Sequence, residues 1–116
     1  MRVNFDDTDV DDGLRVTYQG EWFTGEAIEV DRAGNIISLS AYINGREDGL
    51  SQEWYSDGTL RHSGMVKLGM AVGMHQEWYP NGQLISQREF DSGGDELARR
   101  RWDEAGNLIE EKIYHQ

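Results

Sequence analysis

The chain has 116 residues, with 22 acidic and 11 basic side chains and a formal net charge of −11. This length fits one domain, and the excess of carboxylates argues against binding to nucleic acid or to an anionic membrane, because both attract lysine and arginine. The absence of cysteine excludes disulfides, thiolate catalysis and cysteine-based metal sites. Because no apolar run suggests a signal peptide or a membrane span, we expect a cytoplasmic protein that needs no cofactor.

Residues 1–13 are predicted to form a flexible acidic arm. It contains five aspartates within seven residues: Asp6, Asp7, Asp9, Asp11 and Asp12. An EF-hand calcium loop needs glycine at its sixth position and glutamate at its twelfth, and neither requirement is met when the count begins at Asp7. We therefore expect no metal site, with a weak cation site as the less favoured alternative. The arm is either inert or touches a basic groove of a partner, so its aspartates are secondary binding candidates.

A repeat of 24 residues organises the rest of the chain. Glycines recur at positions 34, 58, 82 and 106 without insertions, and tryptophan precedes three of them by four residues. Isoleucine or leucine follows each glycine by two residues. The repeats are predicted at approximately 25–48, 49–72, 73–96 and 97–116, within a single domain.

Each repeat is predicted to be a β-hairpin with a three-residue loop, in which the glycine takes the left-handed conformation of a G1 bulge. Such a loop places Trp54 opposite Leu60. The expected fold is all-β, an antiparallel meander of stacked hairpins in a single extended, twisted sheet. Strict alternation along each strand predicts one face that carries the tryptophans together with Tyr42, Val66, Phe90 and His62, and puts His75 on the other face.

The segments Gly49–Leu60 and Gly73–Leu84 share the pattern G-x-x-x-E-W-Y-x-[DN]-G-x-L. This pattern resembles the bacterial variant of the MORN repeat, which occurs in toxin–antitoxin and polymorphic-toxin immunity proteins. The resemblance covers residues 25–116 well and residues 14–24 loosely, although the first and fourth repeats lack the Glu-Trp-Tyr triplet. It implies a small antitoxin or immunity protein that binds a cognate toxin.

Alternation also predicts an acidic ladder on the face opposite the tryptophans. Its members, the primary candidates for partner binding, are Glu29, Asp31, Glu53, Tyr55, Glu77 and Tyr79. Tyrosine suits protein interfaces, and carboxylates attract a basic partner. The alternative is a solvated outer face without a partner. The one basic cluster, Arg99 to Arg101, is expected to place Arg99 and Arg101 on this acidic face and to pair with Glu77 or Glu111.

No catalytic motif is present, and the expected separation of His62 from His75 argues against a shared site, so we predict that the protein is not an enzyme. The leading hypothesis is an antitoxin or immunity protein that neutralises one toxin by stoichiometric binding. The net charge favours a toxin that acts on nucleic acid, a nuclease or a deaminase, because its substrate groove must be basic. The alternative is a structural MORN-type scaffold without a toxin partner. The free protein is expected to be a monomer or a weak homodimer.

Overall fold

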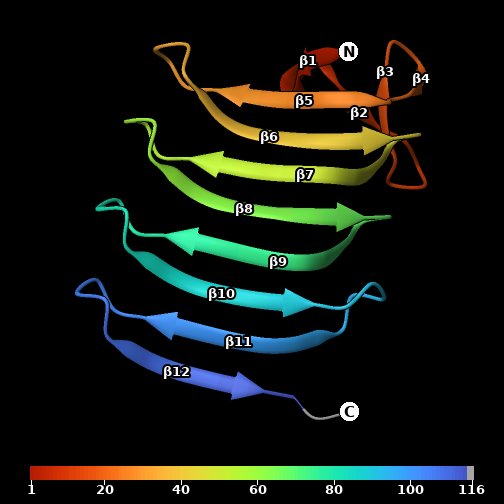
Figure 1. Ribbon diagram of the computed structural model, residues 1–116. Coiled ribbons are helices and arrows are strands. Elements are labelled where there is room, and N and C mark those ends of the chain that lie inside the picture. Colours follow the sequence, from red (N-terminus) through yellow and green to blue (C-terminus); the bar gives the residue numbers. More distant parts are fainter. Residues whose placement is uncertain (115–116) are drawn as a thin grey trace.

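The computed structural model describes residues 1–114, of which the great majority lie in strands or tight turns (Figure 1). Residues 115 and 116, the last two of the fourth predicted repeat, lie outside the described residues. The short N-terminal elements are β1 (Arg2–Asn4), the 3-10 turn η1 (Phe5–Asp7), β2 (Asp9–Val10), β3 (Val16–Tyr18) and β4 (Glu21–Trp22). The longer strands are β5 (Gly25–Val30), β6 (Ile36–Ile43), β7 (Arg46–Trp54), β8 (Leu60–Lys67), β9 (Met70–Trp78), β10 (Leu84–Phe90), β11 (Glu96–Trp102) and β12 (Leu108–Ile113).

Strands β5 to β12 form an antiparallel meander in chain order, and β1 joins its edge by pairing in parallel with β5. The result is an open, twisted sheet of nine strands, accompanied by a small sheet of β2, β3 and β4. Strands make up 61% of the chain, so the predicted all-β class is confirmed. The prediction of one purely antiparallel sheet is wrong in two details, the parallel β1 and the separate small sheet.

The four predicted hairpin loops have the predicted geometry. In the second repeat the Gly58 N–H donates to the Tyr55 carbonyl, and the Tyr55 N–H donates to the Thr59 carbonyl, with Gly58 at φ 91°. Trp54 consequently faces Leu60 across the strands. The equivalent pairs are Val30 with Ile36, Trp78 with Leu84 and Trp102 with Leu108. Glycine is required at the third loop position because side chains disfavour positive φ.

Residues 1–13, which were predicted to form a flexible arm, are folded, and together with residues 14–23 they form a cap on the first hairpin. Val3 pairs with Ala27 through β1 and β5, and the side chain of Phe23 is 2% exposed. Phe23 lies between Tyr18 and Tyr42, with ring centroids 6.1 and 6.0 Å apart. Because Val3, Val16, Phe23 and Ala27 form the buried cluster, the main hydrophobic core lies where the cap meets the first hairpin. The prediction missed the cap because its strands are too short to show an alternating pattern.

Residues paired across strands share a side of the sheet, which defines two faces. Glu29 pairs with Ser38, Ser38 with Glu53, Glu53 with His62 and His62 with Glu77, so these residues share what we call the Glu face. Gln52, Ser63 and Gln76 are paired on the other side, which also carries Trp54, Trp78 and Trp102 and is called the Trp face.

Tyr42, Val66 and Phe90 lie on the Glu face, so the prediction that placed them with the tryptophans is wrong. The reason is a bulge behind each hairpin loop: the register shifts between Glu53 and Trp54, so that Leu60 faces Trp54 while His62 faces Glu53. One extra residue reverses the alternation for the rest of the strand. The residues between each bulge and the end of the same strand therefore lie on the side opposite to the one predicted, whereas the strand that leads into the next loop is placed as predicted.

Candidate functional site

A row of carboxylates crosses the Glu face, as predicted. Glu29, Glu53 and Glu77 are all exposed and stand on alternate strands β5, β7 and β9. Since neighbouring strands are about 4.8 Å apart, successive carboxylates of this row are about 10 Å apart. A regular array of exposed acids at this spacing suits a partner that presents lysine and arginine.

The two tyrosines of the predicted ladder join one repeat to the next. The Tyr55 hydroxyl donates to the Trp78 carbonyl at 2.7 Å, and the Tyr79 hydroxyl donates to the Trp102 carbonyl at 3.0 Å. Both side chains are half-buried at the hairpin loops. Their polar tips are thus engaged within the sheet, and a direct contact with a partner stays a prediction for these residues.

Asp31 shapes the first hairpin loop. Its Oδ1 accepts the backbone N–H groups of Ala33 and Asn35 at 2.9 and 3.0 Å. The hydrogen bond from Asn35 is the main reason why the pKa of Asp31 lies below its ordinary value. Asp31 is therefore charged and fixed beside the carboxylate row, at a loop rather than within a strand.

The five N-terminal aspartates divide into one structural residue and four exposed ones. Asp11 accepts the backbone N–H of Arg15 and the indole N–H of Trp22, both at 2.9 Å, and the Arg15 bond is the main cause of its lowered pKa. Its partners Arg15 and Trp22 stack with 3.7 Å between guanidinium and ring. Asp6, Asp7, Asp9 and Asp12 are exposed on the cap. Within residues 1–114 no group of three or more histidine, aspartate or glutamate side chains is arranged to hold a metal ion.

His62 and His75 form a pair that alternation along the strands did not predict. His62 Nε2 lies 3.3 Å from His75 Nδ1, and His75 Nε2 lies 2.7 Å from the Met65 carbonyl oxygen. His75 fits because residue 64 is glycine, where a Cβ atom would collide with the imidazole. Burial is the main cause that lowers the pKa of His62, and His75 adds to it, against the opposing charges of Glu53 and Glu77. The bulge that follows a three-residue loop is the sequence signal that could have revealed this pair.

A small pocket of about 80 Å³ opens beside the histidines, lined by His62, Ala71, His75, Glu77, Ser86, Arg88 and Phe90. The Phe90 ring meets the His75 ring edge-on at 5.4 Å, and the Arg88 guanidinium lies 5.1 Å from the Phe90 centroid. The volume of this pocket suits the tip of one side chain rather than a small-molecule ligand.

The arginine cluster lies partly as predicted. Arg99 and Arg101 share the Glu face, because Arg99 pairs with Arg88 and Arg101 with Ser86 across β10 and β11. The partners of the ion pairs differ from those predicted. Arg99 contacts Glu96 at 2.6 Å instead of Glu77 or Glu111, and the arginine that contacts Glu111, at 2.7 Å, is Arg100. Arg88 also contacts Glu96, at 2.8 Å. Hydrogen bonds from Arg99, with support from Arg88, lower the pKa of Glu96 from 4.5 to about 2.

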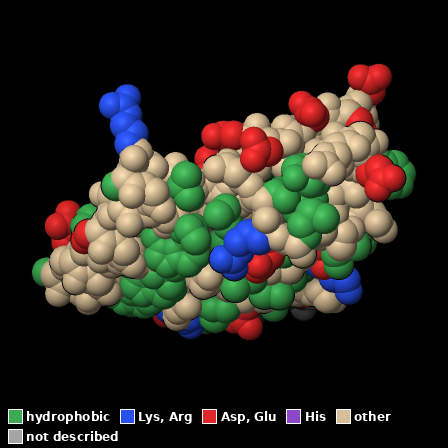
Figure 2. Space-filling model, turned by 90° about the horizontal axis from the view of Figure 1, so that it is seen from above, with side chains coloured by type: hydrophobic (Ala, Val, Ile, Leu, Met, Phe, Trp, Pro, Cys, Tyr) green, Lys and Arg blue, Asp and Glu red, His purple; other side chains and the backbone are tan. Residues whose placement is uncertain are grey.

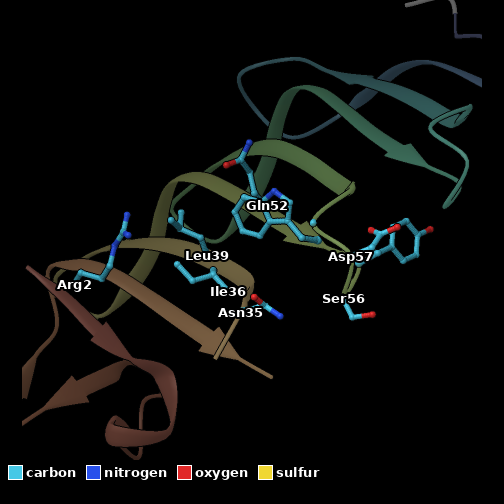
Figure 3. A pocket seen from close by; sticks show the side chains of 10 residues that line it. Arg2, Asn35, Ile36, Leu39, Gln52, Ser56 and Asp57 are labelled. Atoms are coloured by element: carbon cyan, nitrogen blue, oxygen red, sulfur yellow. The ribbon is translucent and has the colours of Figure 1, made fainter. Parts of the chain in front are cut away.

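The Trp face carries a second concavity, an open groove of about 500 Å³ between the first and second hairpin loops (Figure 3). Leu39, Ile36 and Gln52 lie in its middle, with Arg2 at one end and Ser56 and Asp57 of the next loop at the other. Trp54 also lines it. Viewed from the cap end, the molecule shows several exposed patches of apolar side chains, with single charged side chains between them (Figure 2).

Among residues 1–114 there is no helix of the length and apolar character needed to cross a bilayer. A family model described as the MORN repeat variant matches residues 71–92, which cover most of β9 and all of β10. No curated protein and no solved structure shows a significant match to the chain. The hairpin β9–β10 is thus a MORN repeat variant, which suggests a repeat-based interaction or scaffold module.

Proposed function

We propose that this protein is an antitoxin or immunity protein that neutralises a cognate bacterial toxin by stoichiometric binding, without catalysing a reaction itself. The observation that carries the proposal is the row of Glu29, Glu53 and Glu77, exposed at regular spacing on one face of a repeat sheet. The MORN repeat variant at residues 71–92 supports an interaction module. The choice of a toxin as the partner rests on the resemblance of Gly49–Leu60 and Gly73–Leu84 to the repeats of immunity proteins.

The partner in this proposal has a basic surface. A toxin that cleaves or deaminates nucleic acid must attract phosphates, and its substrate groove is therefore cationic. Carboxylates at about 10 Å intervals complement such a groove and accelerate the encounter. Inhibition by occupying that groove, or a surface beside it, needs no catalytic residue in the inhibitor.

The test is co-expression of the chain with the protein encoded by the neighbouring reading frame, which the proposal expects to be a toxin that arrests growth when expressed alone. Wild-type protein should restore growth and co-purify with the toxin. The variant E53K/E77K should lose both effects, because it reverses the charge of two of the three carboxylates in the row. The matched control is E89K/E104K, which changes the net charge equally at two exposed glutamates, one on the Trp face and one in a hairpin loop. Absence of rescue by the wild type, or equal loss in both variants, would refute the proposal.

The groove on the Trp face favours a second candidate, a scaffold module without a toxin. Trp54 and Leu39 could hold an apolar segment of another protein there, with Arg2 and Gln52 at its polar contacts. Under this alternative, Gln52→Glu and Trp54→Ala would abolish partner capture, whereas E53K/E77K would not.

A further inference from the structure

The charges of the Glu face are divided into two halves along the sheet. On β5 to β9 the face carries Glu29, Glu47, Glu53 and Glu77. Two arginines lie near this half: Arg61 sits at the bulge of β8 with its guanidinium 5.9 Å from the Tyr55 ring, and Arg15 of the cap stacks on Trp22. On β10 to β12 the same face carries the cations Arg88, Arg99, Arg101 and Lys112, against the acids Glu96 and Glu110. The boundary between the halves runs between β9 and β10.

The cap extends the acidic half. Its core residues Val3 and Phe23 pack against Ala27 and Tyr42, which lie on the Glu face of the first hairpin. Phe23 therefore places the cap over that face at the β5 end of the sheet, and the exposed Asp6, Asp7, Asp9 and Asp12 add four carboxylates to this end of the molecule. A surface that approaches this end meets carboxylates from both the cap and the sheet.

Apolar side chains lie where the two halves meet. Val66 pairs with Ala71 across β8 and β9, and Phe90 pairs with Gly73 across β9 and β10. An apolar centre with charged surroundings is the usual arrangement of a protein–protein contact. The sheet contributes most to principal extents of 47 and 41 Å, enough for the approximately 800 Å² per partner of a standard interface.

We infer that the Glu face is self-complementary and binds a second copy of this chain. A two-fold axis near the boundary places the acidic half of one copy on the basic half of the other, and does so twice. The cap of each copy then lies over β10 to β12 of its partner, with its aspartates toward Arg101 and Lys112. The apolar centres of the two copies meet at the axis. This inference does not require a toxin. Although the net charge of the chain is −11, the Glu face has a locally positive half that can bind the negative half of a second copy.

Two charge-reversal variants test the inference, E53K/E77K and R101E/K112E. All four positions are exposed, so the substitutions leave the buried cluster of the cap untouched. In sedimentation velocity, wild-type protein should shift from 13.3 kDa toward twice that mass as its concentration rises. Each variant alone should associate at least about tenfold more weakly, because each faces its own copy with like charges. An equimolar mixture should associate as well as the wild type.

The mixture separates local complementarity from net charge, since its total charge equals that of two wild-type chains. The E53K/E77K variant is less negative overall than the wild type. If it associates more tightly than the wild type, net charge governs association and the inference is wrong. Two further results would overturn the inference: a wild type that stays monomeric, and a mixture of the two variants that forms no heterodimers. Association that neither variant weakens would also overturn it, because edge-to-edge pairing of strands would give that result. A toxin and a second copy would occupy the same face, and R101E/K112E distinguishes the two, because it weakens self-association while it keeps the carboxylate row on which the growth test of the proposed function depends.

Discussion

The hydroxyl of Tyr55 donates a hydrogen bond of 2.7 Å to the backbone carbonyl of Trp78, 23 residues further along the chain. Tyr79 makes the same contact with Trp102 one repeat later. The side chain at the start of one hairpin loop is thereby fixed to the end of a strand in the next hairpin. The Glu-Trp-Tyr triplet thus unites two functions, because its glutamate faces solvent while its tyrosine connects neighbouring repeats.

Removing this hydroxyl should weaken the stacking of repeats. Tyr55→Phe and Tyr79→Phe should each lower the free energy of unfolding by about 1 kcal/mol, since the carbonyl loses its partner while the ring stays in place. Urea denaturation measures the effect. Tyr18→Phe is the control, because its hydroxyl meets only the exposed Gln19 amide at 3.4 Å. Equal stability of Tyr55→Phe and wild type would contradict this role.

In the first three hairpin loops, glycine should be required for its backbone conformation alone, because a Cβ added at Gly34, Gly58 or Gly82 would meet no atom within 4 Å. Gly58 has φ 91°, and a Cβ added there would meet nothing within 4 Å. Gly58→Ala should therefore cost about 1 kcal/mol by conformational strain without any clash, and Gly58→Asn should cost less because asparagine tolerates positive φ. Thermal unfolding of both variants would check the order, and a costlier asparagine would refute the explanation.

His62 should make stability depend on pH in the mildly acidic range. The folded state lowers the pKa of His62 below its ordinary value of 6.5, mainly through burial. The unfolded chain then takes up the proton first, so stability is complete above about pH 6.5 and decreases as the pH falls toward the lowered pKa. Denaturation curves across this range, compared with His62→Gln, provide the measurement. A wild type and variant with the same pH dependence would contradict the prediction.

A second window should appear at lower pH through Glu96. Because Arg99 and Arg88 lower its pKa from 4.5 to about 2, folding favours the charged carboxylate. The associated stability is present above pH 4.5 and is lost as the pH falls toward 2. Glu96→Gln should remove this part of the pH profile, whereas Glu104→Gln, at an exposed loop, should preserve it. An unchanged profile in Glu96→Gln would show that the two ion pairs contribute little.

The repeat and its loops could be predicted because glycine at positive φ is a strictly local requirement, repeated every 24 residues. The carboxylate row could also be predicted, because Glu29, Glu53 and Glu77 each precede a loop, where no bulge disturbs the alternation of side chains along the strand. Residues after a loop, such as His62 and Phe90, were assigned to the wrong face because the bulge adds one residue. The cap escaped prediction because strands of two or three residues depend on tertiary contacts, above all those of Phe23.

The most direct test of the account is methyl NMR of the chain bound to the toxin that it neutralises in the growth assay. Val66 and Ala71 report on the Glu face, while Met65 and Met74 report on the Trp face from neighbouring positions of the same strands. The account predicts that complex formation shifts or broadens the Val66 and Ala71 signals and leaves those of Met65 and Met74 in place. Perturbation of Met65 and Met74, with Val66 and Ala71 unchanged, would contradict it.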